Sequence, residues 1–218
     1  MGMEQFVSQI ITSGKRSHFV TEKHNTFSIK GLDDSSKGFL KGFREIVLHP
    51  GGEYVLPLSD KVNVIVPLIG AVHYDREDDN EAVFFPGEVV CLGNSSQAMV
   101  LANAYPHNTV IFLLVEFDVW NFDLSNHVKC ADFKKYNFLH VFEFSKQIKV
   151  ATGLYQSREE GEYIPDGDHR SVFVYVINGV FEVSGRLLEE RDGLFIPHCG
   201  NIDFEALAPE SVLLFLEG

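Results

Sequence analysis

The sequence predicts an all-β protein built from two tandem jelly-roll barrels packed together. Three observations lead to this fold class. Helix signals are scarce, short strand signals are dense, and landmarks of the first half of the chain recur in the second half. The chain has 218 residues, which is long enough for two small barrels that each bury a core.

The expected strands are short, rich in Val, Ile, Phe and Leu, and separated by Gly, Pro, Asn or Asp. In the first half they are REIVLHP, EYVLPL, KVNVIVPLIGAVHYD, AVFFPGEVVCLG, QAMVLANA and TVIFLLVEFDVW. Residues 120–144 have a mixed pattern, which predicts a connector with one short helical turn. The strands resume as IKVATGLYQ, GEYIPD, SVFVYVINGVFEVSG, GLFIP, NIDFEAL and SVLLFLEG.

A duplication explains the two series of strands. The tripeptide GEY at 52–54 recurs at 161–163, a shift of 109 positions, and Gly70 recurs as Gly179 with the same shift. Two landmarks with one offset of half the chain length indicate a repeated domain. The predicted organisation is an N-terminal barrel with its leading strands at 1–119, a connector at 120–144 and a C-terminal barrel at 145–218.

The order and spacing of several segments resemble the pirin-like bicupins of the cupin superfamily. The segments are NTFSIKGLDDSSKGF, HPGGEYVLPLSDKVNVIVPLIGAVHYDRE, FFPGEVVCL and the second half that ends in LLFLEG. This resemblance covers nearly the whole chain. It implies two double-stranded β-helix barrels, and an N-terminal barrel that in this group holds one iron-type metal through His-x-His-x-x-x-Glu and a later His.

The chain departs from that ligand pattern. The family register places the four ligands at Leu56, Leu58, Val62 and Val100, with Met99 as the one-residue alternative for the last. Hydrocarbon side chains offer no donor atom to a cation. We therefore expect no metal and no other cofactor in the N-terminal barrel.

Loss of the metal leaves two expectations for the interior of that barrel. Side chains fill it, as in most small barrels, or it forms a dry pocket for a small apolar ligand. The candidate lining residues of such a pocket are Leu56, Leu58, Val62, Val100 and His73.

The second barrel has no good ligand at the positions equivalent by the repeat shift. Its remaining cluster for a metal or a general base consists of Asp168, His169, His198 and Asp203. The alternative is that these are ordinary turn and rim residues. No catalytic residue is predicted, because the sequence has no nucleophile elbow, phosphate-binding loop or dinucleotide motif.

Charge and cysteine content limit the partners. The net charge of −13 argues against nucleic acid and anionic membranes. Three widely spaced cysteines, odd in number, fit a reducing cytoplasm without a disulfide framework. Phe117, Trp120 and Phe122 are candidates for a contact between barrels or for a homodimer interface.

Two functions remain open from the sequence. The first is a metal-free bicupin of the pirin-like type, which acts without catalysis as a small-ligand-binding or protein-interaction protein. The alternative is a metal-dependent dioxygenase of the quercetin-cleaving type that uses a displaced metal site in the C-terminal barrel.

Overall fold

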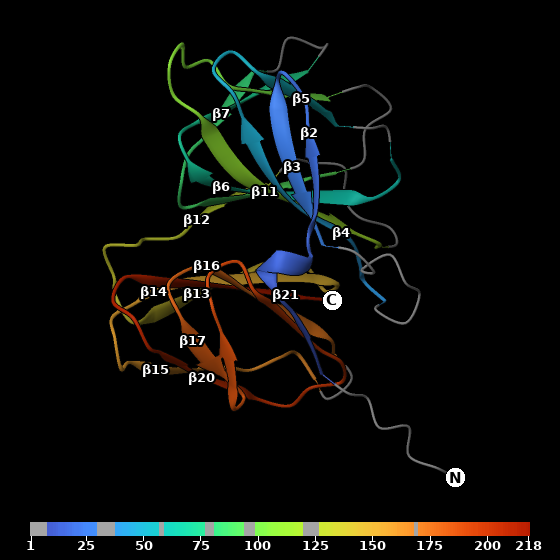
Figure 1. Cartoon of the computed structure of the whole chain (residues 1–218). Coiled ribbons are helices and arrows are strands. Elements are labelled where there is room, and N and C mark those ends of the chain that lie inside the picture. The colour runs from blue at the N-terminus through green and yellow to red at the C-terminus, as the bar shows by residue number, and fades with distance from the viewer. Residues whose placement is uncertain are drawn as a thin grey trace. The chain divides into compact units, whose positions relative to one another are not determined.

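A computed structural model describes most of the chain and confirms the all-β prediction (Figure 1). The described residues are 8–29, 38–56, 59–76, 81–93, 99–119, 127–167 and 170–218. Within these ranges the one helical element is a 3-10 turn, η1 (Ser13–Lys15), and no helix is long and apolar enough to cross a membrane.

The chain forms two compact units. One comprises Arg16–Cys130, and the other comprises the N-terminal segment up to Lys15 together with Ala131–Gly218. Each unit consists of one larger and one four-stranded antiparallel sheet. We call these units the first barrel and the second barrel.

Among its described residues the first barrel contains eleven strands in two sheets. The larger sheet has, in spatial order, β12 (His127–Cys130), β9 (Glu88–Leu92), β6 (Val62–Ile69), β11 (Val110–Phe117), β4 (Leu40–Leu48), β3 (His24–Ser28) and β2 (Ser17–Val20). The smaller sheet has β5 (Glu53–Leu56), β10 (Met99–Ala102), β7 (Val72–Arg76) and β8 (Ala82–Phe84).

The described part of the second barrel contains ten strands. The larger sheet has β1 (Gln9–Ile11), β19 (Gly193–Ile196), β16 (Val172–Asn178), β21 (Ser211–Glu217), β14 (Ile148–Tyr155) and β13 (Phe138–Ser145). The smaller sheet has β15 (Glu160–Tyr163), β20 (Ile202–Ala206), β17 (Phe181–Val183) and β18 (Arg186–Leu188).

Both barrels repeat one eight-strand pattern. The order β9-β6-β11-β4 over β5-β10-β7-β8 in the first barrel becomes β19-β16-β21-β14 over β15-β20-β17-β18 in the second. This identity of strand order confirms the duplication predicted from the GEY and glycine landmarks. The double-stranded β-helix fold of a bicupin follows from it.

The interior of each barrel is a hydrocarbon core set by strand alternation. In the first barrel its buried members are Ile46, Leu48, Leu56, Ile65, Val72, Tyr74, Phe84, Val90, Leu92, Met99, Leu101, Val110, Phe112 and Leu114. In the second barrel they are Ala151, Tyr155, Tyr163, Val172, Val174, Val176, Phe181, Val183, Leu188, Leu194, Ile196, Cys199, Ile202, Phe204, Ala206, Leu213 and Phe215.

The boundaries of the barrels differ from those expected. Strand β1 pairs with β19, so the N-terminal segment belongs to the second barrel rather than to the first. The expected connector 120–144 contains β12, which pairs with β9, and most of β13, which pairs with β14. Such long-range pairing has no signal in local sequence, which explains the difference. Residues 120–126, with Trp120 and Phe122, lie outside the described residues, whereas Phe117 is fully buried.

The repeated glycine makes the same turn in both barrels. Gly70 joins β6 to β7 with φ +73°, and Gly179 joins β16 to β17 with φ +83°. Left-handed backbone of this kind favours glycine. A Cβ at Gly179 would in addition collide with the Ser211 hydroxyl, which itself accepts a hydrogen bond from the amide of Val180 at 3.4 Å.

We expect Gly179→Ala to destabilise the protein more than Gly185→Ala. Gly185 also has a positive φ, of +69°, but no atom lies within 4 Å of a Cβ placed there. Gly185→Ala should lower the free energy of unfolding by about 1 kcal/mol for the backbone conformation alone. Gly179→Ala should lower the free energy of unfolding by a further ~1–3 kcal/mol, because the added Cβ collides with Ser211. Chemical denaturation of both variants measures the difference, and equal losses would contradict this account of the turn.

Candidate functional site

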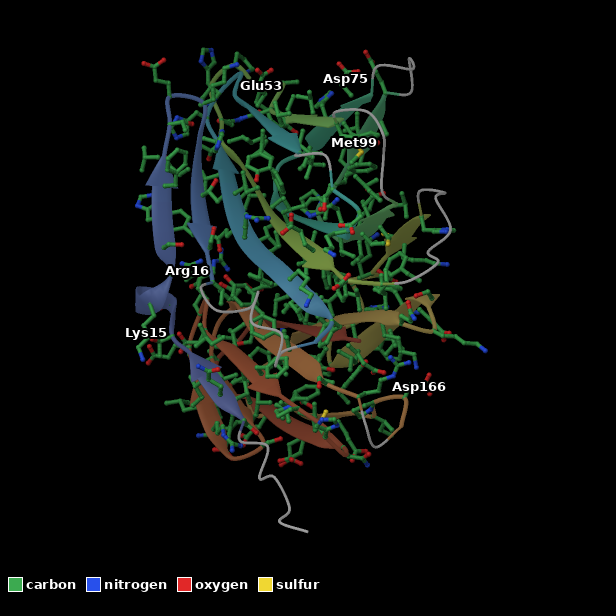
Figure 2. All side chains as sticks on the ribbon, turned by 90° about the vertical axis from the view of Figure 1, so that its right-hand side faces the viewer. Lys15, Arg16, Glu53, Asp75, Met99 and Asp166 are labelled. Atoms are coloured by element: carbon green, nitrogen blue, oxygen red, sulfur yellow. The ribbon has the colours of Figure 1, made fainter. Side chains whose placement is uncertain are left out.

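Met99 is the residue paired with Leu56 inside the first barrel. The two residues are direct partners across β5 and β10, and both are almost fully buried in the core; Figure 2 labels Met99. The hydroxyl of Tyr74 lies 3.2 Å from the Met99 sulfur. The one-residue alternative named from the sequence is therefore the inner residue of β10.

The other residues expected to line an apolar pocket do not gather there. Val100 follows an inner residue on β10 and so faces the other side of its sheet. Val62 stands three positions before the inner Ile65 and also faces away from the core of the first barrel. His73 lies between two inner residues of β7 and is half-buried on the outer face. Leu58 lies outside the described residues. The pocket is thus not assembled as predicted, because a shift of one residue along a strand exchanges its two faces.

A charged pair occupies the inner face near one end of the first barrel. On β11 the inner series of alternate residues continues to Glu116, and on β4 Arg44 stands two positions before the inner Ile46. The Nη1 atom of Arg44 lies 2.9 Å from Oε2 of Glu116. Because an unpaired buried charge is costly, each side chain stabilises the other in this position.

Gly42 provides the space for this carboxylate. It is the direct partner of Glu116 across β4 and β11. A Cβ at Gly42 would collide with Oε2 of Glu116 and would lie 3.3 Å from Nη1 of Arg44. The glycine is therefore needed for close approach of a side chain rather than for a turn.

Tyr54 belongs to the same electrostatic neighbourhood. Its ring packs against the core of the first barrel from β5, and its edge contacts the ring of His24 at a centroid distance of 5.1 Å. Burial raises the pKa of Tyr54, while the charge of Arg44 lowers this pKa and the charge of Glu116 raises it. The phenol therefore stays protonated and remains a hydrogen-bond donor at neutral pH.

The second barrel contains a closely related group. Glu217, at the end of β21, is only 2% exposed, and the Tyr163 hydroxyl donates a hydrogen bond of 2.6 Å to its Oε2 atom. Its Oε1 atom accepts a hydrogen bond of 3.0 Å from the amide of Asp166 and lies 3.7 Å from Nε of Arg170. The carboxylate is thus surrounded by donors.

Burial and this hydrogen bond act together on Tyr163. Its ring stacks on Phe215 at a centroid distance of 4.7 Å. Burial raises the pKa of Tyr163 well above its usual range, and the hydrogen bond to Glu217 raises this pKa further. Asp166, which Figure 2 labels, also forms an ion pair of 3.2 Å with Lys149. Both the backbone amide and the side-chain carboxylate of Asp166 therefore fix the segment after β15.

The two groups occupy equivalent positions in the repeat. Glu116 is paired with Asn63, and Glu217 is paired with Val172. These partners are 109 positions apart, the same shift as for the GEY tyrosines. Each barrel therefore places a tyrosine from its GEY tripeptide near a glutamate from the last strand of the repeated eight-strand pattern.

The arginine is where the two groups differ. Arg44 is paired with Leu114, whereas the equivalent Phe215 is paired with Ala151. The second barrel thus has a methyl group where the first has a guanidinium, and its tyrosine reaches the glutamate directly. In the first barrel Arg44 binds the glutamate instead.

Sequence reasoning missed both glutamates, although a signal was present. Glu116 in VIFLLVEF and Glu217 in VLLFLE follow core residues in strict alternation. A charged residue in phase with the inner positions of a strand predicts a buried, paired charge. Both segments have the pattern of an apolar strand with a polar end, so the inward orientation of the two glutamates was not predicted.

The cluster expected in the second barrel is only partly visible. Asp168 and His169 lie outside the described residues. His198 is exposed in the turn after β19 with φ +46°, and Asp203 is exposed on β20 between two core residues. Asp203 lines an open, acidic hollow on the outer face with Glu160, Gly161, Glu182, Phe204 and Glu205. Across the described ranges, no group of three His, Cys, Asp or Glu residues is arranged to hold a metal ion.

We expect Tyr163→Phe to lower the free energy of unfolding by about 1.5–3 kcal/mol at pH 7, because a buried carboxylate loses a donor. The exposed Tyr136 offers a control, and Tyr136→Phe should change stability by less than about 0.5 kcal/mol. Since the folded-state pKa of Tyr163 is raised, its contribution is present below about pH 10 and declines as the pH rises further. Urea titrations at pH 7 and at alkaline pH test both statements; a Tyr163→Phe variant as stable as the parent would refute them.

The three cysteines should differ in reactivity. Burial raises the pKa of the Cys91 thiol to about 12 and that of the Cys199 thiol to about 11, whereas Cys130 is exposed. A thiol-specific reagent at pH 8 should label Cys130 at least about 10-fold faster than the other two. The fast phase should vanish in Cys130→Ser, and its survival there would show that a buried thiol is accessible.

Comparisons with known proteins agree with the fold. Residues 143–216 match the family model of the quercetinase C-terminal cupin domain. The bacterial pirin YhhW from Escherichia coli, in complex with nickel(II), is similar at a TM-score of 0.79 with 14% identity, over 96% of this chain and 98% of that chain. No curated protein matches the sequence.

Two further solved structures have the same fold. GK1651 from Geobacillus kaustophilus is similar at a TM-score of 0.77 with 13% identity, over 96% of this chain and 94% of that chain. Quercetin 2,3-dioxygenase from Acinetobacter baumannii is similar at a TM-score of 0.73 with 12% identity, over 96% of this chain and 85% of that chain. The resemblance to the pirin-like bicupins is therefore confirmed, by sequence over most of the second barrel and by fold over the whole chain.

Proposed function

We propose that the protein is a non-catalytic bicupin that binds a small ligand without a transition metal. The observation that carries this proposal is the inner face of β5, β7 and β10. Its described residues are Tyr54, Leu56, Val72, Tyr74, Met99 and Leu101.

These side chains do not fit the metal that the fold family implies. The similar YhhW structure contains nickel(II), and ions of this kind require imidazole, carboxylate or thiolate ligands. The described inner face offers one thioether and two phenols among hydrocarbons. This statement covers the inner positions of β5, β7 and β10 whose side chains the structure describes.

The remaining polar groups also favour binding over catalysis. Glu217 is held by three donors from its own barrel, and Glu116 is held by Arg44. A general base needs a free lone pair directed at a substrate proton. Glu217 uses both of its oxygens in such contacts, and Glu116 directs its Oε2 atom at the Arg44 guanidinium.

Elemental analysis of the purified protein tests the proposal. We expect less than about 0.1 equivalent of iron, nickel, copper or zinc, also after incubation with each ion and desalting, because the described inner residues of β5, β7 and β10 offer no imidazole, carboxylate or thiolate to such ions. A stoichiometric transition metal would contradict the proposal.

The same experiment addresses the dioxygenase alternative, which needs a displaced metal site in the second barrel. If a metal is retained, His198→Ala and His169→Ala should abolish both its uptake and any oxygen consumption with quercetin. Retained metal that is insensitive to both substitutions would exclude that site as well. Absence of metal together with absence of oxygen consumption supports the binding function.

A further inference from the structure

We propose that the first barrel binds a small organic carboxylate through Arg44 and Tyr54, with Glu116 holding the guanidinium in place. This inference specifies the ligand class of the binding function proposed above and rests on it. It is carried by the contrast between two equivalent groups in one chain.

Arg44 has donor capacity that its own barrel does not use. Its Nη1 atom is buried and, within the described part of the chain, makes no hydrogen bond. The 2.9 Å approach to Glu116 is an ion pair without the direction of a hydrogen bond. A guanidinium carries five N–H donors in a planar fork, and one carboxylate uses at most two of them. The Arg44 side chain is 28% exposed, so solvent reaches this inner position.

The second barrel shows what the same residue types recognise. There a tyrosine hydroxyl and an arginine converge on a carboxylate, that of Glu217. In the first barrel the equivalent carboxylate is drawn to Arg44, and no hydrogen bond of the Tyr54 hydroxyl is found among the described residues. A tyrosine donor and an arginine donor are thus left for a carboxylate that the chain does not supply.

The fold itself does not require this arginine. The equivalent position in the second barrel is Ala151, and that barrel closes with the same strand order. A buried ion pair contributes little net stability, because desolvation offsets most of the attraction. In the first barrel Arg44 pairs the charge of Glu116, and we assign the remaining donors of its fork to recognition, because their geometry matches a carboxylate.

The surrounding residues limit the size and place of the ligand. The core residues Leu56, Met99 and Leu101 are almost fully buried. The missing side chain of Gly42 leaves room for the charged pair itself. The carboxylate must therefore enter from the side where solvent reaches Arg44, with its apolar remainder on that side of the charged pair.

Titration calorimetry with benzoate and acetate as probes tests the inference, and benzamide is the neutral comparison for benzoate. The parent protein should bind benzoate at least about 10-fold more tightly than benzamide, since charge-assisted hydrogen bonds are lost in the amide. Arg44→Met should weaken benzoate binding at least about 10-fold and Tyr54→Phe about 3–10-fold. Arg158→Met is the matched control, because Arg158 also pairs with a glutamate, at 3.2 Å, but on the exposed surface; it should bind benzoate as the parent does.

Several results would overturn the inference. They are absence of both benzoate and acetate binding to the parent, equal binding of benzoate and benzamide, or unchanged affinity in Arg44→Met. If Arg44→Met does not fold, Arg44→Lys replaces it: this variant keeps the charge, loses the fork and should bind benzoate at least about 5-fold more weakly. A metal-free protein that ignores carboxylates would refute this inference alone, whereas a stoichiometric metal would refute the proposed function.

Discussion

The last strand of the repeated eight-strand pattern directs a carboxylate into a hydrocarbon interior in each barrel, and this charge has to be paired. Burial of an isolated carboxylate costs far more than a domain can offset, so the neighbours of Glu116 and Glu217 are constrained by them. In the second barrel Tyr163, Arg170 and the amide of Asp166 meet this need. The segment that follows β15 is thereby attached to the end of β21. In the first barrel the same need is met by Arg44 from β4 and by the absent side chain of Gly42.

Duplication gives this constraint two solutions in one chain. In the second barrel the tyrosine hydroxyl donates its hydrogen bond directly to the glutamate of the same barrel. In the first barrel Glu116 pairs with Arg44 instead of with the tyrosine. One solved structure with this fold contains nickel(II), whereas the contacts described for both glutamates are to side chains and a backbone amide of this chain. The scaffold therefore tolerates exchange of its interior chemistry as long as the net buried charge stays small.

The fold could be predicted because its signals are local or repeated. Alternating strands, the GEY tripeptide and the glycines at 70 and 179 are visible in the sequence and suffice for two barrels. The candidate site depends on strand phase, where an error of one residue reverses the outcome. Met99 rather than Val100 is the inner residue of β10 for this reason. Pairing of β1 with β19 joins segments almost two hundred residues apart, and no local pattern encodes it.

The donors of the first barrel keep their character over a wide pH range. An arginine does not lose its proton in a protein, and burial raises the pKa of Tyr54, so that the phenol stays a donor beyond neutral pH. Protonation of the incoming acid removes the charge that Arg44 recognises. The ligand itself therefore sets the lower pH limit of this recognition, while the donors that the barrel contributes are present on both sides of that limit.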